Sequence, residues 1–167
     1  WISGYNGLMR FDGVKFDIFN KGNVPAFKTD IIRKLAQDGE GTLWMTTQGS
    51  GLVSYKDGEF TSHGIEQGLE NLSRALFIDR TNRIWSSSPE KGWFMVEHCE
   101  FTFLKHTTDL ASIEVRAITQ GRTGEMWFGT MGEGLFCYRN GSFNVITTKE
   151  GLQNQWIYSL LVDKANR

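Results

Sequence analysis

The chain has 167 residues, of which 18 are basic and 19 acidic, so its net charge is −1. That balance excludes a strong long-range attraction to nucleic acid or to an anionic membrane surface, and no segment approaches the roughly 20 apolar residues that cross a bilayer. The 19 glycines against 2 prolines predict many tight turns, and the 13% of aromatic residues favours strands over helices.

Four tryptophans recur along the chain at almost constant intervals. Trp1, Trp44, Trp85 and Trp127 are 43, 41 and 42 residues apart. In a sequence rich in strand-forming residues, a period of about 40–45 residues is typical of propeller blades. The tryptophans therefore predict four structural repeats.

The first repeat shows the order of features that the others follow. After the strand at its tryptophan, Gly7-Leu8 opens a second strand, Asp12-Gly13 predicts a tight hairpin and Phe16 begins a third strand. A long loop over 20–30 then leads to the apolar run 31–35, which we expect to be the first strand of the next repeat.

The same features return in the same order in the later repeats. The glycine-apolar pairs are Gly51-Leu52, Gly92-Trp93 and Gly134-Leu135, the turns are Asp57-Gly58, His98-Cys99 and Asn140-Gly141, and the phenylalanines are Phe60, Phe101 and Phe143. Further apolar runs at 72–78, 115–118 and 156–162 predict first strands, and the recurring Trp and Phe side chains predict the core between repeats.

Each repeat thus predicts four short antiparallel strands, and no segment carries a helical amphipathic stripe over three turns. One such sheet cannot bury both faces by itself, whereas radial stacking of sheets buries them. We predict an all-β fold, a β-propeller of four blades, as one domain over 1–167. The blades could close as a four-bladed ring, join a second copy in an eight-bladed ring, or pair with further blades of a larger propeller.

Two stretches carry a family resemblance. Asp38-Gly39-Glu40-Gly41-Thr42-Leu43-Trp44-Met45-Thr46-Thr47 with Gly51-Leu52, and Gly124-Glu125-Met126-Trp127-Phe128-Gly129-Thr130 with Gly134-Leu135, resemble the two-component regulator propeller repeat. The third repeat departs from that pattern, with Ser87-Ser88 in place of Gly-Thr. The resemblance implies a sensor region on the periplasmic or extracytoplasmic side of a bacterial membrane protein, upstream of a histidine kinase or cyclase.

Ligand recognition is expected on the long loops between repeats, because irregular loops carry most binding functions. Arg33, Arg74, Arg116 and Tyr158 share one position in the predicted first strands, near the propeller axis. Three converging guanidinium groups would suit a carboxylate or phosphate. The alternative is that each arginine pairs with a nearby loop carboxylate or carbonyl. Neighbouring loops add Tyr5, Gln48, Lys91 and Glu133, with Trp156 as a candidate surface for sugar stacking.

Enzyme chemistry is not predicted. His63, His98 and His106 lack metal-ligand spacing, and the sequence has no nucleophile elbow, P-loop or dinucleotide fingerprint. We expect no cofactor and no metal. Two functions stay open: a sensor module that binds a carbohydrate or an anionic small molecule, and a protein–protein assembly scaffold without a small ligand.

Overall fold

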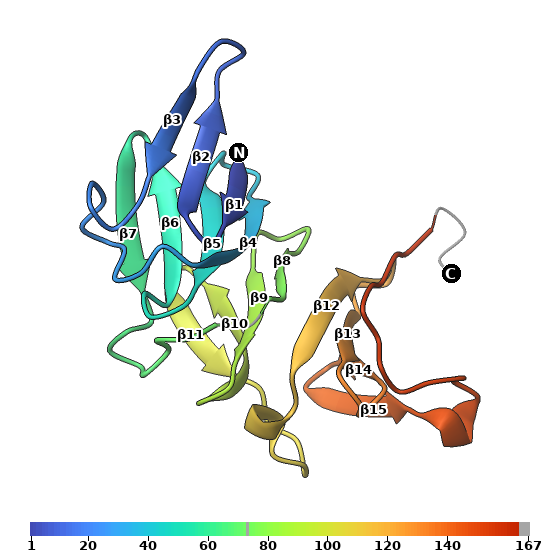
Figure 1. Ribbon diagram of the computed structural model, residues 1–167. Coiled ribbons are helices and arrows are strands. Elements are labelled where there is room, and N and C mark those ends of the chain that lie inside the picture. Colours follow the sequence, from blue (N-terminus) through green and yellow to red (C-terminus); the bar gives the residue numbers. More distant parts are fainter. Residues whose placement is uncertain (73, 164–167) are drawn as a thin grey trace. The chain divides into compact units, whose positions relative to one another are not determined.

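The computed structural model describes residues 1–72 and 74–163. The chain forms two compact units, Trp1–Leu72 and the remainder that begins at residue 73. Each unit contains two antiparallel β-sheets joined by loops, and the described residues include two short 3-10 helices but no α-helix (Figure 1). The predicted all-β architecture of four propeller blades is confirmed.

The first unit holds a three-stranded and a four-stranded sheet, each with its strands in chain order. The three-stranded sheet consists of β1 (Ile2–Gly4), β2 (Gly7–Phe11) and β3 (Phe16–Phe19). The four-stranded sheet consists of β4 (Ile32–Gln37), β5 (Leu43–Thr47), β6 (Leu52–Lys56) and β7 (Glu59–His63).

The second unit holds two four-stranded sheets of the same topology. The first consists of β8 (Leu76–Ile78), β9 (Ile84–Ser88), β10 (Gly92–Glu97) and β11 (Glu100–Phe103). The other consists of β12 (Val115–Gln120), β13 (Met126–Thr130), β14 (Leu135–Arg139) and β15 (Ser142–Ile146), and the helices are η1 (Leu110–Ser112) and η2 (Thr148–Glu150).

In the three four-stranded sheets the tryptophans mark one position, as the repeat predicts. Trp44 lies opposite Ser54, Trp85 opposite Met95 and Trp127 opposite Cys137, each pair one residue into its strand ladder. The predicted hairpin turns also form, with left-handed backbone at Asp57 (φ 50°) and Asn140 (φ 51°). Such turns match the right-handed twist of the flanking strands.

Each unit has a core of its own, built by the facing sides of its two sheets. In the first unit Leu8 from the three-stranded sheet packs with Met45 and Val53 from its neighbour. In the second unit Trp93 stacks on Phe128 with ring centroids 4.7 Å apart. Apolar residues that alternate along the strands therefore fill the space between sheets, as stacking of blades requires.

Two expectations from the repeat need correction. The run 156–162 is not a strand: Trp156 forms an isolated bridge with Met131, and the residues after it are irregular. A strand needs a continuous ladder of hydrogen bonds, whereas this segment meets the end of β13 through that isolated bridge and a bond from the Ile157 N–H to the Thr130 carbonyl at 2.8 Å. The recurring aromatics are also not uniformly core, since Trp1 is 42% and Phe16 52% exposed.

None of the helices among the described residues has the length and apolar character that a bilayer crossing demands.

Candidate ligand-binding site

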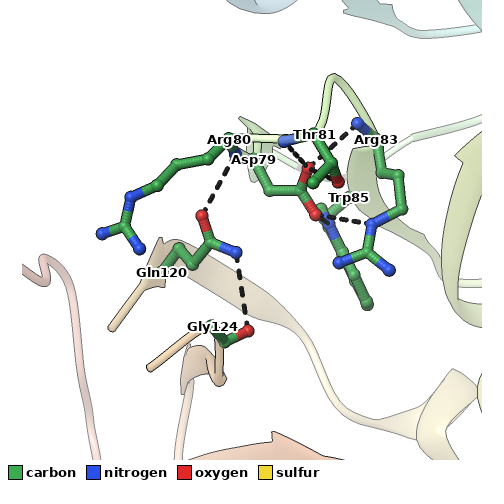
Figure 2. A network of polar contacts seen from close by, with 7 residues as sticks. All are labelled: Asp79, Arg80, Thr81, Arg83, Trp85, Gln120 and Gly124. Atoms are coloured by element: carbon green, nitrogen blue, oxygen red, sulfur yellow. Dashed lines mark hydrogen bonds and ion pairs between the residues drawn. The ribbon is translucent and has the colours of Figure 1, made fainter. Parts of the chain in front are cut away.

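A carboxylate under the repeated tryptophan organises the turn at one end of the sheets. In the turn between β8 and β9, Asp79 Oδ1 accepts hydrogen bonds from the backbone N–H groups of Thr81 (2.9 Å) and Arg83 (3.0 Å) (Figure 2). Its Oδ2 accepts from Arg83 Nε at 2.7 Å and from the indole Nε1 of Trp85 at 2.9 Å. Burial alone raises the pKa of Asp79, but these hydrogen bonds outweigh it and lower the pKa.

Asp38 makes the equivalent arrangement in the first unit. Its Oδ1 accepts from the N–H groups of Glu40 and Thr42, both at 2.9 Å, and its Oδ2 accepts from Trp44 Nε1 at 2.9 Å. The expectation that this aspartate satisfies turn backbone groups describes the observed contacts. The bond to the indole was missed, although the constant six-residue spacing between Asp and Trp was visible in the sequence.

The last sheet replaces this aspartate with a different residue. Gly121 stands at the aspartate position, and Glu125, four residues later, places its carboxylate over this glycine. Thr123 donates to Glu125, Arg139 pairs with it at 3.4 Å, and a hydrogen bond from Trp127 is among the contacts that lower its pKa. The carboxylate–indole contact is therefore retained although the sequence position changes.

The predicted ligand residues Arg33 and Gln48 meet at the opposite end of the sheets in the first unit. The Nη2 atom of Arg33 donates to Gln48 Oε1 at 3.0 Å, and the backbone N–H of Gln48 donates to the carbonyl of Ile31 at 3.0 Å. The backbone of Gln48 also forms an isolated antiparallel bridge with Asn71. The Arg33–Gln48 contact joins an arginine that the sequence placed in a first strand to a glutamine that it placed on a neighbouring loop.

A β-bulge directs the arginine at this position in both units. The register of β4 against β5 shifts between Ile32 and Lys34, which leaves Arg33 as the extra residue. The register of β12 against β13 shifts around Arg116 in the same way. Bulges re-aim side chains and are frequent beside binding sites.

Both bulge arginines hold an Nε atom that is buried and has no hydrogen-bond partner within the described residues. Arg116 Nε lies 3.1 Å from Glu114 Oε1, which is an ion pair whose angles do not make a hydrogen bond. The pairing with a loop carboxylate that the alternative reading predicted is therefore present for Arg116. Within the described residues, neither Nε–H group donates a hydrogen bond.

In two of the four-stranded sheets, glycine N–H groups in one loop bind the segment that follows the sheet. The N–H groups of Gly49 and Gly51 both donate to the carbonyl of Glu70, at 2.9 and 3.0 Å. In the second unit Gly132 and Gly134 donate to the carbonyl of Gln155, at 3.2 and 3.0 Å. The sequence marked Gly51 and Gly134 as strand openers but did not reveal this double contact.

The remaining predicted site residues lie on loops at the same end of their sheets. Tyr5, Lys91, Glu133 and Trp156 are exposed loop residues, Tyr158 is exposed in the irregular terminal segment, and Arg74 is exposed just before β8. Trp156 lies beside Gly132, whose added Cβ would be 3.8 Å from the indole Nε1. Because Arg33 belongs to one unit and Arg74 and Arg116 to the other, a ring of three arginines stays a prediction.

A cavity in the second unit involves none of the predicted ligand residues. It has a volume of about 400 Å³ and is lined by Trp127 and Leu135 on one side and by the terminal segment on the other, with the complete lining formed by Thr119, Gly121, Glu125, Trp127, Leu135, Leu160, Leu161 and Val162. Among residues 1–72 and 74–163, no group of three or more His, Cys, Asp or Glu could hold a metal ion.

Comparison with known proteins gives matches at the level of structure. No family model and no curated protein matches the sequence. The extracellular domain of the hybrid two-component system BT4673 from B. thetaiotaomicron matches over 99% of this chain and 23% of its own, with a TM-score of 0.81 and 18% identity. That of BT3049 from the same organism matches over 97% and 23%, with a TM-score of 0.78 and 17% identity.

An enzyme shares the fold at lower similarity. Virginiamycin B lyase from Staphylococcus aureus matches over 87% of this chain and 50% of its own, with a TM-score of 0.68 and 14% identity. At these identities the comparisons establish the fold. The chain spans about a quarter of the length of these two extracellular domains.

Proposed function

We propose that this chain is part of the ligand-recognition region of a bacterial signal-transduction protein, on the extracytoplasmic side of the membrane. Its structural similarity to two extracellular domains of hybrid two-component systems supports this function. The repeat resemblance in the sequence supports it independently, because it rests on residues around Trp44 and Trp127 and not on the overall fold. The ligand is a carbohydrate or an anionic small molecule.

The observation that carries the ligand class is the pair of bulge arginines. Arg33 and Arg116 occupy the same strand position, and each keeps a buried Nε without a hydrogen-bond partner in the described chain. A guanidinium group can bind a carboxylate through two parallel N–H bonds, and a donor left unsatisfied away from water is costly. A carboxylate-bearing ligand at Arg33 would satisfy its Nε, and one at Arg116 would add to the ion pair that its Nε forms with Glu114.

The amide of Gln48 fits the same ligand class. Its Oε1 accepts from Arg33, so the amide is oriented by the protein before any ligand arrives. Its NH₂ group, a donor of two hydrogen bonds, suits the hydroxyl oxygens of a sugar. A sugar acid therefore combines the two features that this end of the sheets recognises.

Calorimetric titration with a uronic-acid oligosaccharide tests the proposal, with a neutral oligosaccharide of equal length as the control ligand. We expect R33Q and R116Q each to weaken binding of the acidic sugar about tenfold or more, since hydrogen bonds to charged groups contribute about 1.5–3 kcal/mol. K34Q removes a charge from the next position of β4, whose side chain is exposed, and should leave binding unchanged.

Thermal unfolding of the same variants separates the two readings of the arginines. If R33Q and R116Q lower the melting temperature while acidic-sugar binding stays at the level of K34Q, the arginines are structural and the ligand proposal is wrong. The assembly function would then be the better account of this chain.

A further inference from the structure

The sequence contains two Asn-Gly pairs, and the structure places them in opposite surroundings. Asn6-Gly7 lies at the start of β2, and Asn140-Gly141 forms the turn between β14 and β15. In such a pair the backbone nitrogen of the glycine can attack the side-chain amide carbon of the asparagine, because glycine has no side chain to hinder the approach. The surroundings of the glycine nitrogen decide whether this reaction proceeds in the folded chain.

The nitrogen of Gly7 is held in place by the fold. Its N–H group donates a hydrogen bond to the carbonyl of Asp30 at 2.8 Å, and the residue is buried. A Cβ on Gly7 would collide with the carbonyl oxygen of Phe19, so the backbone has little space in which to rotate. Attack by this nitrogen requires that the hydrogen bond and the packing be broken first, which costs free energy.

The nitrogen of Gly141 has no such restraint. Asn140 and Gly141 are both exposed, and the Gly141 N–H donates no hydrogen bond among the residues that the structure describes. A Cβ on Gly141 would meet nothing within 4 Å. The left-handed backbone of the pair, with φ angles of 51° and 82°, must rotate before the two groups can meet. Exposed turns open at a low cost in free energy, so this rotation is accessible in the folded chain.

Exposure is a property of this hairpin position in the other sheets as well. Asp12-Gly13 in the three-stranded sheet and His98-Cys99 between β10 and β11 are likewise exposed, although each of these sheets packs against a neighbour in its own unit. The exposure of the turn is therefore set by its place at the end of a hairpin and not by the number of sheets.

We propose that Asn140 is a site of deamidation in the folded chain and that Asn6 is protected. The Gly141 nitrogen forms a bond to Cγ of Asn140 while the Cγ–Nδ2 bond breaks, and the side-chain nitrogen leaves as ammonia with the proton of the Gly141 N–H. One water molecule then opens the succinimide ring at either carbonyl, which gives aspartate or isoaspartate. The reaction involves no oxidation or reduction, and water is its co-reactant.

Isoaspartate at this position should weaken the hairpin. The turn has two residues between the paired Arg139 and Ser142, and isoaspartate adds a carbon atom to the main chain there. The next pair in the ladder is Tyr138 and Phe143, and the Phe143 ring centroid lies 5.6 Å from that of Trp93 in the preceding sheet. A turn of the wrong length therefore disturbs the register that places these rings against their neighbour.

Mass spectrometry of tryptic peptides follows the two sites separately after incubation of the folded chain at mildly alkaline pH. Trypsin cleaves after Arg10 and Arg139, so Asn6 and Asn140 fall on different peptides. We expect Asn140 to deamidate about tenfold or more faster than Asn6, and incubation in concentrated urea to bring the two rates within about twofold. The proposal is wrong if Asn140 stays intact in the folded chain, if Asn6 reacts at the same rate, or if the difference persists in urea.

The variant N140G is the matched control for the effect on the hairpin. A Gly-Gly turn accepts the same left-handed backbone and has no side-chain amide to react. The unaltered chain should melt about 2–4 °C lower after the incubation than before it, whereas N140G should keep its melting temperature. An unchanged melting temperature in a sample whose Asn140 has reacted, or an equal loss in N140G, would contradict the effect.

Discussion

The carboxylate of Glu125 occupies the space in which a side chain at Gly121 would lie. A Cβ added to Gly121 would come within 2.1 Å of Glu125 Oε1, closer than any real contact of a Cβ atom. In the other two four-stranded sheets an aspartate at this position reaches the indole directly, at 2.9 Å for both Asp38 and Asp79. The carboxylate of the longer glutamate can therefore lie beside the tryptophan only because residue 121 has no side chain.

Replacing the Gly121–Glu125 arrangement by the aspartate arrangement of the other sheets should show this dependence. We expect G121D to lower the free energy of unfolding by about 2–4 kcal/mol, because it forces two carboxylates into one buried space. The double variant G121D/E125T copies the Asp38–Thr42 arrangement and should recover most of that loss. Denaturant unfolding of the single and double variants measures the coupling, and additive effects of the two substitutions would contradict it.

Loss of the charge at Asp79 should be costly. D79N removes a buried carboxylate that accepts hydrogen bonds from Thr81, Arg83 and Trp85, and we expect it to lower the free energy of unfolding by about 2–4 kcal/mol. D57N changes an exposed turn residue whose left-handed backbone asparagine also tolerates, and it should have almost no effect. Equal effects of the two substitutions in urea unfolding would show that Asp79 is not special.

The depressed pKa of Asp79 also predicts an acid-side loss of stability. Its carboxyl has a lower pKa in the folded chain than its ordinary value of 3.8. Its contribution is therefore complete above that value and is lost as the pH falls through it toward the folded pKa. Melting curves recorded below about pH 5 should show a shallower decline for D79N than for the unaltered chain.

His63 predicts a second pH dependence at milder acidity. Burial lowers the pKa of His63 below 6.5, and its Nε2 lies 2.9 Å from Ser54 Oγ. Because the unfolded chain binds this proton more readily, stability should be highest above pH 6.5 and fall as the pH drops through that value. H63Q should remove this part of the pH profile of the denaturation midpoint, whereas H98Q, at an exposed turn, should retain it.

Two glycines of the last sheet separate backbone strain from close contact. Gly134 and Gly141 have nearly equal φ angles of 83° and 82°, but a Cβ on Gly134 would meet the carbonyl oxygen of Ile146 at 2.4 Å, whereas one on Gly141 would meet nothing within 4 Å. G141A should therefore cost about 1–2 kcal/mol from backbone strain alone. G134A should cost about 2 kcal/mol more. Similar melting temperatures for the two variants would show that the contact relaxes without cost.

The strands could be predicted from the sequence because their signals are local. A hairpin turn such as Asp57-Gly58 and an alternating apolar strand specify each other within a dozen residues, and the 42-residue recurrence repeats the evidence. The terminal run 156–162 carries the same local signal, yet it is not a strand in the described chain. A strand depends on hydrogen bonds from a neighbour, which local composition cannot supply.

The candidate site could be predicted only in part. The shared position of Arg33 and Arg116 was readable from the repeat, and so was the loop that carries Gln48. The bulges that direct both arginines were not, because an extra residue in one strand is defined only against its partner. Whether Arg74 joins them stays a prediction.

Residue order alone established that this chain forms repeated antiparallel sheets with a tryptophan at one register, since hydrophobic periodicity and turn chemistry act between near neighbours. Folding in three dimensions established which carboxylate reaches the indole in each four-stranded sheet and which backbone N–H groups hold the loops. Those features depend on distances between segments many residues apart. Glu125 illustrates the difference: only the space above Gly121 shows that it replaces an aspartate.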